Sequence, residues 1–144
     1  MLRIRQLDHL VLRVTDLPAM MTFYIDVLGC SLEKTQEALG LYQLRAGSAL
    51  IDLVPVDGPL GMKGGAAPGK EARNLDHFCL QIDGFDADAI IAHLKACGAD
   101  PAPVASRFGA EGQGPSIYVA DPEGNVVELK GPPWADGVGP QALL

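Results

Sequence analysis

The chain has 144 residues, with 18 acidic against 11 basic side chains and a formal net charge of -7. This length is typical of one domain with a sizeable core, and the negative charge argues against binding to nucleic acid or to an anionic membrane surface. No run approaches the roughly 18 apolar residues of a membrane span, and the amino terminus lacks the apolar core of a signal peptide. We therefore expect a cytoplasmic protein that does not enter a membrane.

The three cysteines are odd in number and form no Cys-x-x-Cys pair, which argues against a disulfide framework and against a thiolate zinc site. A short motif occurs twice, as Leu7-Asp8-His9 and as Leu75-Asp76-His77. Each copy places a histidine in a run of alternating apolar residues. A repeat with a period of about half the chain predicts two similar modules.

The first half begins with an alternating run from Leu7 to Val14 that predicts a strand with His9 and Arg13 on one face. Thr15 or Asp16 can cap a following helix, and Gly29 can end it. Short extended runs around residues 31–33, 41–45 and 49–54 then predict three strands. This half is typical of a βαβββ module.

The second half repeats this order after a segment from residue 55 to 73 that is rich in glycine, proline and small residues. Residues 75–82 predict a strand, and a helix capped by Asp86 is expected to end at Gly98. Residues 101–104, 116–120 and 125–130 predict three further strands, with residues 105–115 as a loop and Asp121-Pro122-Glu123-Gly124 as a turn. The sequence thus predicts an α+β fold of two tandem βαβββ modules that form a curved mixed sheet around a metal cleft. The first module covers residues 4–57, the linker 58–73, the second module 74–131 and the tail 132–144.

A third match aligns residues 48–53 with residues 124–129 and makes Asp52 equivalent to Glu128. Two such modules can place His9, His77, Asp52 and Glu128 around one pseudo-twofold axis. Two imidazoles with one or two carboxylates suit an octahedral divalent ion such as Fe(II), Mn(II), Ni(II), Co(II) or Zn(II). An unpaired buried carboxylate would be costly, which favours metal binding over a passive role. Asp52 is one methylene shorter than glutamate, so it can bind the ion directly, bind through water or only accept a hydrogen bond.

Other polar residues of the same strand faces are candidates for substrate binding. Arg13 and Gln81 are repeat equivalents that can hold a carboxylate or polar group, although surface residues of this kind can equally have no function. Tyr118 shares a face with Ser116, so its hydroxyl can reach the cleft, with a packed aromatic ring as the alternative. His93 lies in the middle of the second helix and is expected to be solvated.

These residues resemble the vicinal oxygen chelate superfamily, which includes glyoxalase I, extradiol dioxygenases, fosfomycin-resistance thiol transferases, methylmalonyl-CoA epimerase and bleomycin-binding proteins. The likeness covers residues 4–131, and its main stretches are Leu7 to Val14, Phe23-Tyr24, Val27 to Gly29, Leu75 to His77 and Asp121 to Leu129. The resemblance implies that His9, His77 and Glu128 bind a metal ion. Asp52 stands where glyoxalase I has a glutamate as fourth ligand, and Val56 stands where an asparagine that helps to bind glutathione is expected.

The resemblance further implies a metal-dependent lyase or isomerase, similar to glyoxalase I, for a small substrate that chelates the ion through two vicinal oxygens. Glu128 and Asp52 are the expected catalytic residues, with Asp52 as the base if it does not bind the ion. Superfamily members of this size usually form homodimers. One alternative is an extradiol dioxygenase with Fe(II) or Mn(II), for which the chain is short. The other is a metal-free binding protein similar to the bleomycin-resistance dimers.

Overall fold

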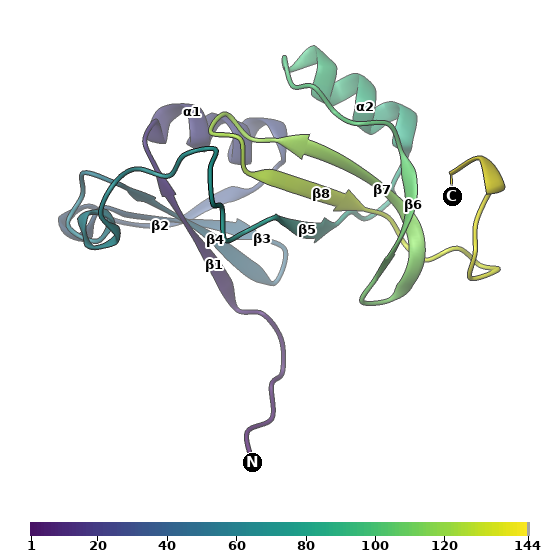
Figure 1. The fold of residues 1–144 in the computed structure, drawn as a ribbon, viewed down its shortest axis with the longest axis horizontal. Helices are drawn as coiled ribbons and strands as arrows, with labels where there is room; N and C mark the ends of the chain where they lie inside the picture. Colours follow the sequence, from purple (N-terminus) through teal and green to yellow (C-terminus); the bar gives the residue numbers. More distant parts are fainter. Residues whose placement is uncertain (144) are drawn as a thin grey trace. The chain divides into compact units, whose positions relative to one another are not determined.

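The structure, a computed structural model, describes residues 1–143, and the chain divides into a compact unit from Met1 to Arg73 and a second that begins at Asn74. Each unit contains one four-stranded mixed sheet and one α-helix (Figure 1). The strands follow the same order in both sheets, β1-β4-β3-β2 and β5-β8-β7-β6. The prediction of an α+β fold with two βαβββ modules is therefore confirmed.

The first unit is built on four strands: β1 (His9–Val14), β2 (Ser31–Gln36), β3 (Leu41–Ala46) and β4 (Ala49–Pro55). β1 runs parallel to β4, and the other neighbouring pairs are antiparallel. Alternation places Leu12 and Val14 in the core, while Val11 on the opposite face is half exposed. Two short 3-10 helices, Glu37–Leu39 and Gly61–Gly64, lie in the connections.

The helical segment of the first unit starts where the sequence predicts it. The carboxylate of Asp16 accepts a hydrogen bond of 3.0 Å from the backbone N–H of Ala19 and so caps α1 (Leu17–Thr22). The helix then continues as a π-helical turn from Phe23 to Val27, which the helical spacing does not predict. It ends before Gly29, whose φ of 81° only glycine adopts readily.

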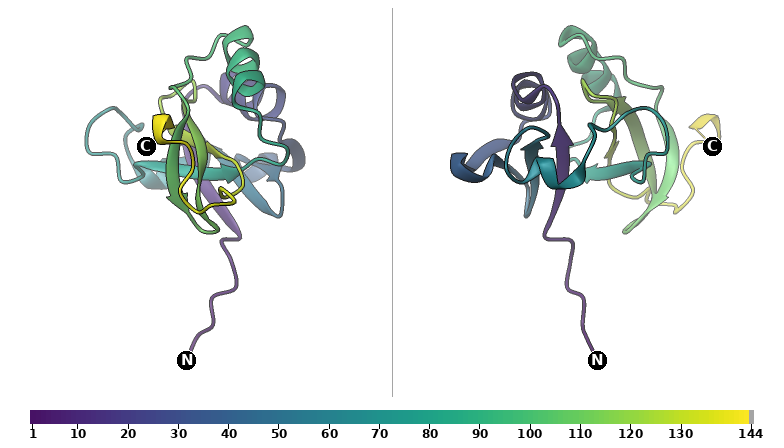
Figure 2. Two further views of the ribbon diagram at one scale, coloured as in Figure 1. Left: turned by 90° about the vertical axis from the view of Figure 1, so that its right-hand side faces the viewer. Right: turned by 60° about the vertical axis from the view of Figure 1, so that its left-hand side comes forward.

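The second unit is built on β5 (His77–Gln81), β6 (Ala105–Gly109), β7 (Gly112–Ala120) and β8 (Val126–Lys130), with β5 parallel to β8. The helix α2 (Ala87–Ala96) lies along one face of this sheet (Figures 1 and 2). Its Leu94 is buried, and Ile117, Val119, Val127 and Leu129 form the buried apolar surface of the sheet. The opposite face of the sheet is left for polar residues.

One predicted strand is wrong. Residues 101–104 form no strand, and the segment 105–115, expected as a loop, contains β6 and the first part of β7. Pro101 and Pro103 lack the N–H groups that a strand needs for its ladder. The two strands join through a tight turn that is flanked by Gly109 and Gly112. Gly112 has a φ of 129°, which favours glycine.

The segment after β8 is attached to the β6–β7 hairpin. The indole N–H of Trp134 donates a hydrogen bond of 2.9 Å to Ser106 Oγ, and its backbone N–H donates one of 2.7 Å to the carbonyl of Gln113. A short 3-10 helix follows at Gln141–Leu143. Within residues 1–143, none of the helices is long and apolar enough to cross a membrane.

Candidate functional site

The two sheets carry matching pairs of a histidine and a carboxylate. In the first unit His9 lies opposite Leu50 on β4, and Asp52 lies two residues further along that strand. In the second unit His77 lies opposite Val126 on β8, and Glu128 lies two residues further along. Residues two apart on a strand share a face. The register thus makes Asp52 and Glu128 equivalent, as the alignment of the two halves predicts.

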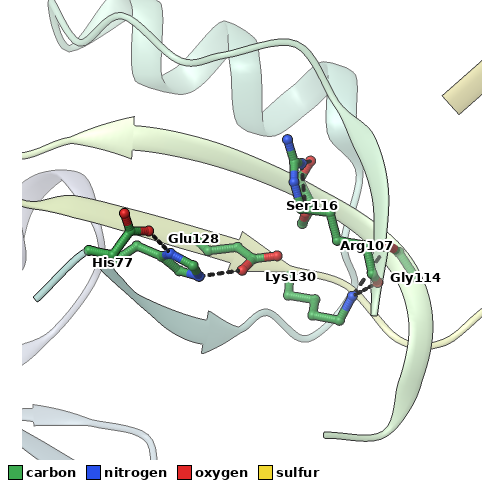
Figure 3. Close-up of polar contacts among 7 residues, drawn as sticks. His77, Arg107, Gly114, Ser116, Glu128 and Lys130 are labelled. Atoms are coloured by element: carbon green, nitrogen blue, oxygen red, sulfur yellow. Dashed lines mark hydrogen bonds and ion pairs between the residues drawn. The ribbon is translucent and has the colours of Figure 1, made fainter. Parts of the chain in front are cut away.

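The pair in the second unit is in direct contact. His77 Nε2 lies 3.3 Å from Glu128 Oε2, while His77 Nδ1 lies 2.7 Å from a carboxylate oxygen of Asp76 (Figure 3). Glu128 is 6% exposed, and its Oε1 is the one buried side-chain oxygen or nitrogen in residues 1–143 that has no hydrogen-bond partner. If Asp76 holds the proton of His77 on Nδ1, the lone pair of Nε2 faces a carboxylate. A cation between Nε2 and the carboxylate would be stabilised by both.

The pair in the first unit has the same orienting aspartate but a different carboxylate environment. His9 Nδ1 lies 2.7 Å from Asp8 Oδ1, and this hydrogen bond raises the pKa of His9, with smaller contributions from the charges of Asp52 and Asp8 and some opposition from burial. Asp52 is 3% exposed, and its two oxygens accept hydrogen bonds of 3.4 and 3.2 Å from the side-chain amide of Gln43. Asp52 is therefore satisfied by protein, whereas Glu128 is not.

The chemistry of these donors fits a divalent metal ion. Imidazole nitrogen and carboxylate oxygen are ligands of the borderline first-row ions. A metal-binding histidine typically donates its other N–H to a carboxylate, which is the arrangement at Asp8-His9 and at Asp76-His77. Across residues 1–143 no three His, Cys, Asp or Glu side chains form a group that could hold an ion, so each unit by itself supplies one pair.

Arg13, the predicted substrate anchor, is bound to the connecting loop. Its Nε donates to the carbonyl of Gly61 at 3.0 Å, and its two Nη atoms donate to the carbonyls of Gly64, Gly65 and Ala66 at 3.1, 2.6 and 3.0 Å. A Cβ on Gly64 would lie 2.4 Å from Arg13 Nε, so the loop closes tightly on the guanidinium. This network ties the guanidinium to the loop of the first unit, and a contact of Arg13 with substrate stays a prediction.

The other two predicted substrate residues lie in the second unit. The ring of Tyr118 lies 5.3 Å from that of His77, centroid to centroid, and burial with the nearby charge of Glu128 raises the pKa of its hydroxyl. Gln81 is exposed at the end of β5, where it lines a cavity of about 160 Å³ together with Lys130. Tyr118 thus belongs to the surroundings of the His77–Glu128 pair, whereas Gln81 belongs to a neighbouring cavity.

Three further residues of this face are not among the sequence-based candidates. Lys130 is 4% exposed, and its ammonium group donates to the carbonyls of Arg107 and Gly114 (Figure 3). Arg107 lies with its guanidinium 4.1 Å from the centre of the Tyr118 ring. Burial and then the charge of Glu128 raise the pKa of Cys79 from its usual 9.0 to about 11. Alternation along β5 and β8 places Cys79 and Lys130 on the face of His77 and Glu128, so the sequence carried a signal for both.

Comparisons with known proteins agree with the two-unit architecture. The profile of the glyoxalase/bleomycin resistance protein/dioxygenase superfamily matches residues 6–129. An integron cassette protein from the mobile metagenome of V. cholerae is 27% identical, with a TM-score of 0.73 over 91% of this chain and 98% of that one. A cassette protein from V. pseudocholerae has the same identity and TM-score, over 91% and 97%. A lactoylglutathione lyase from Agrobacterium tumefaciens is 22% identical, with a TM-score of 0.61 over 88% and 92%, and shares the fold.

Proposed function

Because the chain belongs to the glyoxalase/bleomycin resistance protein/dioxygenase superfamily, we propose that it is a metal-dependent lyase or isomerase, similar to glyoxalase I, that acts on a small substrate bound through two vicinal oxygens. The observation that carries this proposal is the buried, unpaired Oε1 of Glu128 beside Nε2 of His77. A buried carboxylate oxygen without a partner costs about 1–3 kcal/mol, and a bound cation removes this cost.

The ligands of the proposed ion are His9, His77 and Glu128, with Asp52 as a fourth ligand or as the acceptor of a hydrogen bond from a bound water. Nitrogen and oxygen donors without thiolates favour Ni(II), Zn(II), Co(II), Mn(II) or Fe(II). A divalent ion held there supplies a Lewis acid that polarises the substrate oxygens and stabilises negative charge as it develops on them.

The residues of the chain supply the remaining functions. Asp8 and Asp76 orient the two imidazoles through their Nδ1 atoms. If Asp52 does not bind the ion, we assign it the transfer of a proton at a substrate carbon, since Gln43 holds its carboxylate in place and a carboxylate can act as a general base. Tyr118 excludes water beside His77 and offers its hydroxyl to the substrate. Gln81 is a second candidate contact, and the small-molecule substrate is the expected partner.

Metal analysis tests this proposal directly. The protein is purified without chelators, incubated with one divalent ion at a time, desalted and measured by elemental analysis. We expect about one metal ion per protein chain in the parent and less than a tenth of that in the variants His9→Ala and His77→Ala. Truncation of one ligand removes a large part of the affinity for the ion.

The third histidine provides the matched control. His93 is exposed on α2, a helix that carries no member of either pair, so His93→Ala is expected to keep the metal content of the parent. Full metal content in folded His77→Ala would contradict the assignment. A parent protein that retains no ion under any condition would favour the metal-free binding protein instead.

A further inference from the structure

Arg107 shares its sheet face with the His77–Glu128 pair. On β6 it lies directly opposite Gly114, and on β7 Tyr118 lies directly opposite Glu128. Gly114 and Tyr118 are four residues apart on one strand and therefore share a face. The guanidinium of Arg107 reaches the Tyr118 ring, 4.1 Å from its centre, while the backbone carbonyl of Pro132 lies against Gly114.

The guanidinium is held on one side only. Its Nη1 donates to Ser116 Oγ at 2.9 Å and to the Ser116 carbonyl at 3.3 Å, and its plane lies over the Tyr118 ring (Figure 3 shows the contact with Ser116). Within residues 1–143, Glu128 Oε1 is the one fully buried side-chain polar atom without a partner. Nε and Nη2 of Arg107 have no acceptor among the described residues and are therefore not fully buried. These two N–H groups form the parallel fork that matches a carboxylate.

Arg107 lies among charges of both signs. The chain as a whole carries a net charge of -7, which repels anions at long range. Around this sheet face the cations of Arg107 and Lys130 stand beside the carboxylates of Glu128 and Asp76, and Asp83 and Glu111 line a cavity together with Lys130. Lys130 donates its N–H groups to the backbone carbonyls of Arg107 and Gly114, so it fixes the strand that carries the fork.

We propose that Arg107 binds a carboxylate of the substrate beside the His77–Glu128 pair. The substrate is then a small organic acid that carries two vicinal oxygens and one further carboxylate. This substrate class rests on the proposed function, whereas the binding of an anion to Arg107 does not, because all of its contacts lie within the second unit.

The test uses the whole protein after treatment with a chelator, so that no metal ion contributes. The Nε–H signals of the arginines are followed by ¹H–¹⁵N NMR during titration with malonate, with uncharged malonamide and with inorganic phosphate. Arg107→Lys assigns the signal, and the exposed Arg5 reports non-specific ion effects. We expect malonate to shift the Arg107 signal in a saturable way, with malonamide without effect and phosphate at least about fivefold weaker.

The variants separate the fork from the charge. Arg107→Gln is expected to weaken malonate binding, read from the Tyr118 ring signals, at least about tenfold, and Arg107→Lys several-fold, because lysine keeps the charge but loses the fork. Equal shifts at Arg5 and Arg107, tighter binding of phosphate than of malonate, or full affinity in a folded Arg107→Gln variant would each overturn the proposal. Metal content is measured in parallel. Unchanged metal in Arg107→Gln separates a failure of this inference from a failure of the proposed metal site, which His77→Ala reports.

Discussion

Replacing Glu128 by glutamine tests whether this carboxylate serves the fold or a cation. Removal of one partner of a buried ion pair usually destabilises a protein by about 3–5 kcal/mol, because the other charge stays buried and unpaired. That penalty does not apply here, since the His77 side chain is 35% exposed and keeps Asp76 at 2.7 Å. The amide of the new glutamine can in addition donate to His77 Nε2. We therefore expect Glu128→Gln to be as stable as the parent without metal, or more stable by about 1–2 kcal/mol.

A bound ion shifts this comparison toward the parent by about 1.3 kcal/mol or more. An ion at a hundredfold its Kd adds about 2.7 kcal/mol to the parent, and an amide ligand that binds at least tenfold more weakly adds about 1.4 kcal/mol or less to the variant. The assay is urea unfolding by far-UV circular dichroism, once with EDTA and once with Zn²⁺. Glu71→Gln, at an exposed position of the linker, serves as the control and is expected to stay within about 0.5 kcal/mol of the parent. A loss of 3 kcal/mol or more with EDTA would refute this reasoning and make Glu128 a structural partner of His77.

The connecting loop permits two further predictions. Arg13→Ala removes four hydrogen bonds to loop carbonyls, so trypsin cleavage after Lys63 should become at least about tenfold faster. Arg13→Lys should be cleaved at an intermediate rate. An unchanged rate in Arg13→Ala would show that the loop is stable without these hydrogen bonds. Gly61→Ala should lower the free energy of unfolding by about 1–3 kcal/mol, because a Cβ there would lie 1.9 Å from the carbonyl oxygen of Pro55. Gly69→Ala, where a Cβ meets nothing within 4 Å, is its control and should be neutral in the same urea titration.

The sequence predicts those strands in which one face is buried, because apolar and polar residues then alternate along the chain. Alternation on β1 puts Leu12 and Val14 in the core and leaves His9 and Arg13 on the other face, and the structure has this arrangement. The capping aspartate Asp16 likewise marks the start of its helix, as does its counterpart in the second half. Since the same constraint acts twice, the repeat gives the equivalence of the two carboxylates without any knowledge of contacts.

The strand β6, which the sequence analysis missed, buries little of its surface. It is the edge strand of its sheet, and its one large apolar residue, Phe108, is 80% exposed. A strand that buries little leaves no apolar period in the sequence. Pairing with β7 and the glycine turn define it instead, and neither is readable from residues 105–109 alone. Arg107 was missed for the same reason, because residues 105–115 were expected to form a loop and no sheet face could be assigned to its side chain.

The two carboxylates, equivalent in register, differ in what surrounds them. Both oxygens of Asp52 accept hydrogen bonds from the Gln43 amide, which itself accepts one from Gln36, whereas Glu128 has one oxygen with no hydrogen-bond partner in the described chain. A side chain that is one methylene shorter stays closer to its own strand, and Gln43 lies directly opposite it on β3. The repeat has thus kept the position of the two carboxylates but not their surroundings: Glu128 Oε1 has no hydrogen-bond partner in the described residues, whereas Gln43 holds the carboxylate of Asp52 in place. Equivalent positions in the two sheets can therefore have different hydrogen-bond partners. The side-chain amide of Gln43 on β3 is the physical cause of the difference between Asp52 and Glu128.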